Sequence, residues 1–250
     1  MRVRDRLRAI DSKLSHMEMF ATRQAPLALA TGFSGIDAAL GIGGLPAGRI
    51  VEIFGPPSCG KTAFALQTIA HLQRSGSEAA WIDADRTFDL TFASRLGVDV
   101  ARLPVAQPAS AEDALDMTRH LAHSGAVELI AIDSAAALVP ELEIRNGIVL
   151  DREGLQWRVL GSQLRRLSAA AARSRACILF LNQTRVRIHS GAAIEISSGG
   201  PSLKLYAAVR IAISAVGRRV CFRIVKNRLA APYATSELEW RSAAGFIQPA

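Results

Sequence analysis

The chain has 250 residues, 50% of them hydrophobic, which is enough to bury the core of one sizeable α/β domain. Its 30 basic and 22 acidic residues give a net charge of +8, which suits a polyanionic partner such as nucleic acid. No long apolar run or signal-peptide pattern occurs and the three cysteines lack metal-ligand spacing, so we expect a cytoplasmic protein without membrane contact or a zinc site.

Residues 1–20 predict an amphipathic helix with a basic face. The apolar residues at helical spacing are Leu7, Ile10, Leu14 and Met17. We expect this helix to pack against a neighbouring subunit or against its own domain, and other partners stay open. Residues 1–30 are therefore interpreted as an N-terminal helical arm and linker, and residues 31–250 as the core.

The stretch of residues 49–62 dominates the sequence. It contains G-x-x-x-x-G-K-T between a short apolar run, which predicts a buried strand, and an apolar-periodic stretch, which predicts a helix. This context favours a phosphate-binding loop for a nucleoside triphosphate over a purely structural glycine-rich turn. Lys61 would reach the β- and γ-phosphates, and the Thr62 hydroxyl would hold Mg²⁺. The predicted nucleotide-binding residues here are Gly55, Pro56, Pro57, Ser58, Cys59, Gly60, Lys61 and Thr62.

Two further strands are predicted to end in acidic residues. Residues 79–83 end on Asp83, and residues 128–134 contain four apolar residues before Asp133. Ligands bind at the carboxyl ends of parallel strands, so we expect Asp133 to hold Mg²⁺ together with Thr62. Between these strands a helix begins after Ser110, and we interpret its two histidines, His120 and His123, as surface residues and not as a metal pair.

Predicted strands alternate with predicted helices up to residue 182, which indicates a parallel, doubly wound sheet. We expect residues 140–154 to form a loop, residues 155–173 a long helix and residues 176–182 a strand. The next 20 residues, 184–203, are interpreted as a long functional loop, because they carry basic residues and a Ser/Gly-rich run. The chain then closes with a hairpin-like region of two strands, residues 205–214 and 221–225.

The order of these segments resembles the RecA family of bacterial recombinases across nearly all of residues 25–241. Besides the phosphate loop, the matching runs are Gly43-Gly-Leu-Pro-Ala-Gly-Arg-Ile-Val-Glu-Ile, Phe92-Ala-Ser-Arg-Leu-Gly-Val-Asp, Ser124-Gly-Ala-Val-Glu-Leu-Ile-Ala-Ile-Asp-Ser, Leu181-Asn-Gln, Leu203-Lys-Leu-Tyr and Val225-Lys-Asn-Arg-Leu-Ala-Ala-Pro. The resemblance implies an α/β fold: a RecA-like P-loop NTPase core with a mostly parallel sheet flanked by helices, the N-terminal helical arm and a C-terminal antiparallel β extension.

The resemblance also implies ATP and Mg²⁺ as ligands. Asp89 and Phe92 would contact the adenine, and Ser134 would support Asp133 in the Mg²⁺ shell. Asp85 stands where the family has the glutamate that activates the attacking water, so Asp85, Lys61 and Gln183 form the expected catalytic group.

Assembly and DNA binding follow from the same resemblance. Gln183 would sense the γ-phosphate and transmit its presence to the DNA-binding loops. Lys226 and Arg228 would reach the phosphates of a neighbouring subunit, with Lys204 nearby. Segments 141–154 and 184–203 would be the two DNA-binding loops, and the expected contacts to single-stranded DNA are Arg185, Arg187, Gly199 and Gly200.

Several departures from the family pattern bear on function. The Asp85 carboxylate is one C–C bond, about 1.5 Å, shorter than a glutamate, and a misplacement of about 1 Å can cost on the order of a hundredfold in rate, so we expect slow hydrolysis. The chain ends near the end of the core, so we expect the C-terminal domain associated with duplex DNA to be missing. The 184–203 segment has no aromatic residue for base stacking, and the N-terminal arm matches only loosely.

Three functions therefore stay open. The first is an ATP-dependent, single-stranded-DNA-binding protein of recombination and repair, acting in the SOS response to DNA damage and self-associating as a filament or ring. The second is a RecA-like accessory scaffold that binds ATP with little turnover and partners an error-prone polymerase. The third is a nucleotide-binding regulator that has lost DNA binding.

Overall fold

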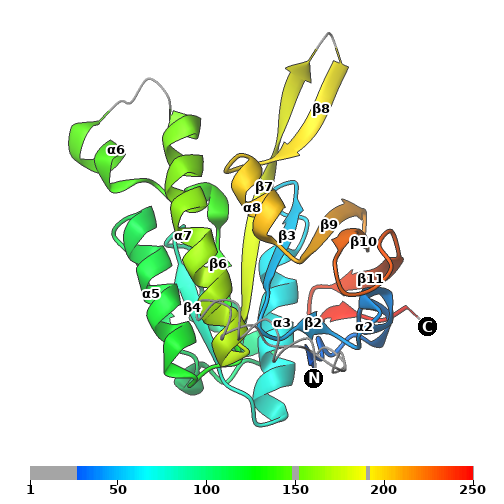
Figure 1. Ribbon diagram of the computed structural model, residues 1–250. Coiled ribbons are helices and arrows are strands. Elements are labelled where there is room, and N and C mark those ends of the chain that lie inside the picture. Colours follow the sequence, from blue (N-terminus) through cyan, green and yellow to red (C-terminus); the bar gives the residue numbers. More distant parts are fainter. Residues whose placement is uncertain (1–26, 148–151, 190–191, 250) are drawn as a thin grey trace, which may run out of the picture.

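The computed structural model describes residues 27–147, 152–189 and 192–249 (Figure 1). Within them a ten-stranded sheet has the order β12-β11-β10-β9-β3-β7-β6-β4-β5, and β8 pairs with β7 off this path. The strands of this sheet are β3 (Ile50–Gly55), β4 (Ala79–Asp83), β5 (Val105–Ala106), β6 (Leu129–Asp133), β7 (Cys177–His189), β8 (Ala192–Ser197), β9 (Val209–Val216), β10 (Arg219–Asn227), β11 (Thr235–Arg241) and β12 (Gly245–Ile247). A separate pair, β1 (Ala28–Leu29) and β2 (Leu45–Pro46), lies before β3.

The sheet is mostly parallel and ends in an antiparallel extension. Strands β5, β4, β6, β7, β3 and β9 pair in parallel in that order. Strands β9 to β12 continue the sheet by antiparallel pairing. The predicted α/β fold class, with its C-terminal antiparallel β extension, is confirmed.

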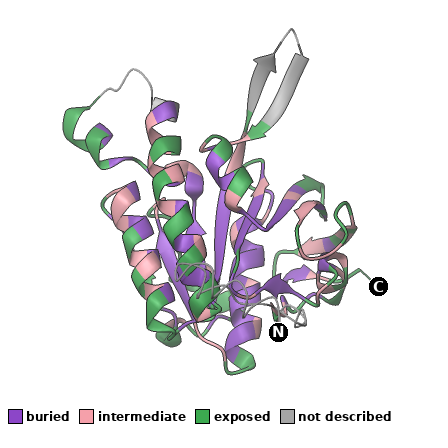
Figure 2. Ribbon diagram, viewed as in Figure 1, coloured by how far each residue is buried: buried purple, intermediate pink, exposed green. Residues whose placement is uncertain are grey.

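Side chains alternate along the central strands and so create one apolar layer on each face of the sheet. On β3, Val51 and Ile53 belong to one buried cluster and Ile50 to the other. The same division separates Leu179 from Phe180 on β7, because successive side chains of a strand point to opposite faces. Each fully buried Leu, Ile or Phe contributes roughly 1.5–3 kcal/mol relative to exposure, so both layers stabilise the core seen as buried strands in Figure 2.

Helices cover both layers. Helices α2 (Ser34–Leu40), α3 (Lys61–Arg74) and α4 (Leu90–Arg95) pack on the first, and α5 (Ala111–Ser124), α7 (Arg152–Ser174) and α8 (Pro201–Tyr206) on the second. Short elements complete the chain: η2 (Val100–Arg102), η3 (Ala135–Ala137) and α6 (Glu141–Asn146). No described helix is both long and apolar enough to span a membrane.

The prediction of a loop over residues 140–154 is wrong for most of that segment. Residues 141–146 form α6, and α7 already begins at Arg152. Helix α6 starts directly after Pro140, has acidic residues in its first turn, and carries an ion pair between Arg145 and Glu141 one turn apart. These are ordinary helix-initiating signals, and they outweigh the absence of a long apolar pattern.

The prediction of a long loop over residues 184–203 is also wrong. Strand β7 continues to His189, and β8 returns antiparallel to it from Ala192, with Thr184 opposite Ser197. Polar and β-branched residues alternate over residues 184–189 and again over residues 194–197, which is the period of a strand. Figure 1 shows this β7–β8 hairpin extending beyond the body of the sheet. Residues 201–206 then form α8, so the predicted strand over residues 205–214 begins only at Val209.

The predicted N-terminal helix over residues 1–20 lies outside the described residues. The end of the expected arm and linker, residues 28–29, is strand β1, which pairs with β2.

Candidate functional site

The phosphate loop joins the end of β3 to the start of α3, as the sequence predicts. Ser58 and Gly60 have left-handed backbone, with φ of 58° and 94°. A Cβ on Gly60 would lie 2.3 Å from Phe246 Cζ, and a Cβ on Gly55 would lie 2.2 Å from the Ile213 carbonyl oxygen. Gly55 is therefore needed for close packing, and Gly60 for close packing and for its left-handed backbone. The turn delivers the N-terminus of a 14-residue helix, which favours anions.

Lys61 is buried at the mouth of this loop. Its Nζ donates to the carbonyl oxygens of Gly55 at 3.0 Å and Pro56 at 2.7 Å, and lies 3.6 Å from Cys59 Sγ. Cys59 is 4% exposed, which favours a packing role for this small side chain over redox chemistry. The exposed residues Pro56, Pro57 and Ser58 form the rest of the loop.

Oxygen donors meet at the first turn of α3. Thr62 Oγ1 donates a hydrogen bond of 2.7 Å to Asp133 Oδ2 at the end of β6. Burial raises the pKa of Asp133 to about 6; the Thr62 hydrogen bond and Lys61 oppose this shift, whereas the Asp85 and Asp83 carboxylates add to it. A bound cation would offset the cost of keeping this carboxylate ionised.

This donor set fits Mg²⁺. Hydroxyl and carboxylate oxygens are the ligands that Mg²⁺ prefers, and it usually takes only one or two carboxylates besides phosphates and water. No cluster of three or more His, Cys, Asp or Glu residues able to hold a metal ion occurs in the described ranges. The Thr62–Asp133 pair therefore fits a metal that the nucleotide helps to hold, and does not form an all-protein cage.

The other two carboxylates at this edge organise backbone. Asp85 accepts hydrogen bonds from the Ser134 N–H at 3.0 Å and the Ser134 hydroxyl at 3.1 Å. Asp83 accepts from Gln107 Nε2 at 2.9 Å and from the backbone N–H groups of Thr87 and Phe88. Asp85 is thus held beside Asp133, and Asp83 shapes the loop that leads to α4.

A hollow of about 370 Å³ opens beside the phosphate loop. Its side away from the loop is largely apolar and comes from distant parts of the chain: Phe92, Ala215, Gly217, Val220, Trp240 and Phe246. The Trp240 and Phe246 rings meet at a centroid distance of 5.1 Å. Phe92 lines this hollow, whereas Asp89 caps α4 by accepting from the Thr91 and Phe92 N–H groups at 2.8 and 3.0 Å.

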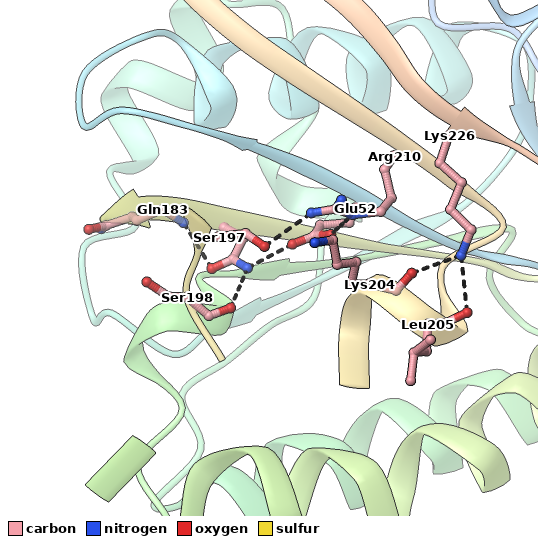
Figure 3. A network of polar contacts seen from close by, with 9 residues as sticks. Glu52, Gln183, Ser197, Ser198, Lys204, Leu205, Arg210 and Lys226 are labelled. Carbon is pink, nitrogen blue, oxygen red and sulfur yellow. Dashed lines mark hydrogen bonds and ion pairs between the residues drawn. The ribbon is translucent and has the colours of Figure 1, made fainter. Parts of the chain in front are cut away.

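A buried polar network links the phosphate-loop strand to the base of the hairpin (Figure 3). Glu52 on β3 is paired with Arg210 on β9, Nε to Oε2 at 2.5 Å, and accepts from Asn182 Nδ2 at 2.8 Å. Arg210 also donates to Ser197 Oγ at 3.0 Å, and Asn182 donates to the Ser198 carbonyl oxygen at 2.9 Å. Side chains from four strands, β3, β7, β8 and β9, thus fix the point where the hairpin leaves the sheet.

The comparisons with known proteins agree with this geometry. The model of the RecA N-terminal domain family matches residues 11–246. The chain belongs to the RecA family. It is 42% identical over 225 residues to Protein RecA of Cytophaga hutchinsonii, which covers 84% of this chain and 63% of that protein.

Other RecA relatives show the same partial coverage. The chain is 41% identical over 239 residues to Protein RecA 1 of Myxococcus xanthus, covering 90% of this chain and 69% of that protein. The chain is 39% identical over 263 residues to Protein RecA of Chlamydia abortus, covering 96% of this chain and 75% of that protein. The chain thus spans about two thirds of the length of several RecA relatives it matches.

The residues expected to connect nucleotide and DNA lie on β7. Gln183 is opposite Gly55, the first residue of the phosphate loop, in the parallel pairing of β7 with β3. Arg185 lines a hollow with residues of η3, α6 and α7, and Arg187 belongs to the hairpin strand opposite Ile194. The structure therefore places Gln183 between the loop and the hairpin.

The two glycines predicted to contact DNA pack closely against α7. Both have positive φ, 82° for Gly199 and 70° for Gly200. A Cβ on Gly200 would lie 2.7 Å from Trp157 Cβ, and one on Gly199 3.2 Å from Leu160 Cδ1. Their absence of side chains has a structural cause, which is the tight turn from β8 into α8.

Lys226 and Arg228 lie away from the phosphate loop of their own chain. Lys226 Nζ donates to the carbonyl oxygens of Lys204 and Leu205 at 2.8 and 3.1 Å (Figure 3). Arg228 also donates to the Leu205 carbonyl oxygen, at 3.0 Å. Burial, with Arg228 and Arg210 nearby, lowers the pKa of Lys226 to about 8. The structure thus brings them together with Lys204 through its backbone, at the end of α8.

Sequence reasoning missed Glu52, Arg210, Trp240 and Phe246. A charged residue inside an apolar strand run, as in Ile-Val-Glu-Ile-Phe, is a signal for a buried ion pair. The partner strand, and the aromatic wall supplied by β11 and β12, depend on pairings that the local sequence does not specify.

Proposed function

We propose that this chain is an ATP-dependent, single-stranded-DNA-binding protein of recombination and repair whose hydrolysis is slow. The observation that carries the proposal is the position of β7. This strand passes the phosphate loop at Gln183, opposite Gly55, and continues without interruption into the hairpin. One continuous strand therefore joins the phosphate loop to the hairpin on which Arg185 and Arg187 lie.

At the nucleotide site, the loop N–H groups and the α3 N-terminus would hold the phosphates, with Lys61 neutralising their charge. Thr62 and Asp133 would hold Mg²⁺, which supplies charge neutralisation at the γ-phosphate when bound. The apolar hollow at Phe92 and Trp240 would receive the base. Asp85 would orient water, and its hydrogen bonds to Ser134 support slow turnover because they hold the short carboxylate toward β6.

At the DNA side, Arg185 and Arg187 would contact phosphates, while Gln183 would respond to the γ-phosphate. The Glu52–Arg210–Asn182 network would keep the hairpin base in register with the phosphate loop. Lys226 and Arg228 would act on the nucleotide of a neighbouring subunit, because in their own chain they face the end of α8.

The test combines ATP hydrolysis with and without single-stranded DNA and electron microscopy of the same samples. DNA-stimulated turnover with helical filaments or rings is the expected result. Substitution Lys61→Ala should abolish both, and Arg185→Ala with Arg187→Ala should weaken DNA binding and flatten its salt dependence. Unchanged DNA binding in the double variant would contradict the role of the hairpin.

A second function is favoured by the position of Asp85. If its hydrogen bonds to Ser134 persist in the assembled state, nucleotide binding would stabilise a scaffold with little turnover, as in an accessory protein that partners an error-prone polymerase. ATP binding without DNA stimulation and without filaments would favour this function.

A further inference from the structure

Helix α7 carries an unusual excess of positive charge. From Gly154 to its end at Ser174 the helix contains four arginines and no acidic residue, and Arg175 directly follows it. An exposed helix face normally mixes both signs, because like charges one turn apart repel. The arginines are Arg158, Arg165, Arg166, Arg173 and Arg175.

Part of this charge faces a groove between α7 and α5, which lie side by side in Figure 1. A hollow of about 480 Å³ is lined by Arg119 and His123 from α5 and by Arg166, Ala169 and Arg173 from α7. Its walls are cationic, and its only apolar lining residue among the described ones is a small alanine. A long, negatively charged polymer could therefore lie in this groove without a clash with large apolar side chains.

The groove is held in place by a bridge between the helices. His123 Nδ1 lies 2.8 Å from the Arg119 carbonyl oxygen, and Arg173 donates to His123 Nε2 at 3.1 Å. One neutral tautomer satisfies both contacts, with Nδ1 donating and Nε2 accepting. The Arg173 guanidinium is therefore aimed across the groove toward α5.

The positive charge is only partly balanced. Arg119 pairs with Asp116 at 3.1 Å. Within the described ranges the Arg166 side chain has no hydrogen-bond or ion-pair partner, and Arg173 has no carboxylate partner. Cations near a helix C-terminus complement its dipole, which accounts for Arg173 but falls off within the last turn. Arg166 lies about two turns earlier, roughly 10 Å along the axis, so the dipole does not explain it.

We propose that this groove binds the phosphodiester backbone of duplex nucleic acid, as a contact surface separate from the hairpin. Arginines recognise phosphates strongly, and the spacing of Arg166 and Arg173 suits two different phosphates. Protein partners instead require a central apolar or aromatic anchor, which this lining lacks.

The groove is distant from the β7–β8 hairpin. Arg173 lies just before β7 begins at Cys177, and the hairpin turn follows its other end at His189. Twelve residues of strand span roughly 40 Å. This inference goes beyond the proposed function, because it requires neither ATP nor the hairpin.

The experiment measures binding of a short labelled duplex of random sequence to the full chain without nucleotide, by fluorescence anisotropy between 50 and 200 mM salt. Arg166→Gln with Arg173→Gln should weaken binding and reduce the slope of log affinity against log salt concentration by about two. The affinity of the variant should therefore fall about tenfold less between 50 and 200 mM salt than that of the unmodified chain. The matched control is Arg74→Gln with Arg241→Gln, which removes the same charge from exposed positions elsewhere. Circular dichroism verifies that both variants fold.

Equal losses in the two double variants would overturn the proposal, since net charge alone would then explain binding. Competition by polyglutamate as strong as by unlabelled duplex, at equal charge, would also overturn it in favour of an acidic protein. Arg166→Gln with Arg173→Gln should leave the ATP-dependent binding of single-stranded DNA at the hairpin unchanged. That variant separates the groove from the proposed function of the hairpin, because a failure of one leaves the other intact.

Discussion

Glu52 and Arg210 form an ion pair of 2.5 Å between β3 and β9, with side chains 0% and 8% exposed. They lie opposite each other in the parallel register of the two strands. The guanidinium also stacks 4.3 Å from the centroid of the Phe54 ring. The pair therefore lies in the interior, where the desolvation of each charge is compensated by its partner and by Asn182 and Ser197.

The first prediction concerns the stability of this pair. Arg210→Met should lower the free energy of unfolding by about 3–5 kcal/mol, because it leaves Glu52 buried without its partner. The double variant Glu52→Leu with Arg210→Met should lose less than the single variant. Urea unfolding measures both.

The exposed pair Arg102–Glu78, 41% and 42% exposed, is the control. Arg102→Gln should cost at most about 1 kcal/mol. A loss as large as that of Arg210→Met would show that burial is not the cause.

The second prediction compares two glycines. Gly60 and Gly76 both have positive φ, 94° and 84°. A Cβ added at Gly60 would lie 2.3 Å from Phe246 Cζ, whereas a Cβ added at Gly76 would have no neighbouring atom within 4 Å. Gly76→Ala should cost about 1 kcal/mol of stability from backbone strain. Gly60→Ala should cost about 1–3 kcal/mol more, because the added methyl overpacks the loop.

Nucleotide binding gives the second readout. Gly60→Ala should lose it, as measured by isothermal titration calorimetry with ADP, whereas Gly76→Ala should retain it. Equal affinities for the two variants would contradict the assignment of the loop.

The sequence predicts most of the nucleotide site because its signals are local. Gly55, Gly60, Lys61 and Thr62 lie in one short stretch between a strand and a helix, and Asp133 ends another apolar run later in the chain. Each of these patterns spans only a few neighbouring residues and can therefore be recognised from the sequence alone. Their meeting at Thr62 Oγ1 and Asp133 Oδ2 follows from the parallel order of strands.

The parts that sequence reasoning missed depend on contacts between distant segments. Arg210 is separated from Glu52 by 158 positions, and the Phe246 side chain reaches Gly60 from the last strand. The β7–β8 hairpin differs from the loop expected there for another reason. The basic, Ser/Gly-containing composition of this stretch is typical of a loop and predicts one. Its period of two, visible in Thr184 to His189, carries the strand signal.

The third prediction concerns turnover. Asp85→Glu should raise the rate of ATP hydrolysis on the order of tenfold to a hundredfold, because the longer side chain extends the carboxylate by one C–C bond, about 1.5 Å, to the length of the family's glutamate. Steady-state kinetics with single-stranded DNA measures it. Asp85→Asn is the control and should lower turnover, and an unchanged rate in Asp85→Glu would mean that its length does not limit hydrolysis.

The fourth prediction uses the aromatic wall. Trp240 lines the hollow beside the phosphate loop, while Trp81 is 1% exposed in the core and Trp157 lies on α7. Binding of ADP should therefore change the fluorescence of Trp240, because the base would enter next to its ring. Trp240→Phe should abolish the change and Trp157→Phe should keep it. A response retained in Trp240→Phe would place the base elsewhere.

The fifth prediction concerns pH. Burial lowers the pKa of Lys226 to about 8, so the ammonium is present at pH 7 and is lost as pH rises through 8. If its charge acts on the neighbouring subunit's nucleotide, DNA-dependent ATPase and assembly should decline between pH 7 and 9, with a midpoint near 8. Activity assays and light scattering across this range measure both.

Two variants of Lys226 separate its role in assembly from its role in folding. Lys226→Arg keeps the charge at alkaline pH, so the decline should move to higher pH. The unfolded chain binds the Lys226 proton more tightly than the folded chain, so the contribution of Lys226 to stability should rise with pH between about 8 and 10.4. Lys226→Met should remove that rise in urea unfolding. A decline with the same midpoint near 8 in Lys226→Arg would assign the pH dependence to another group.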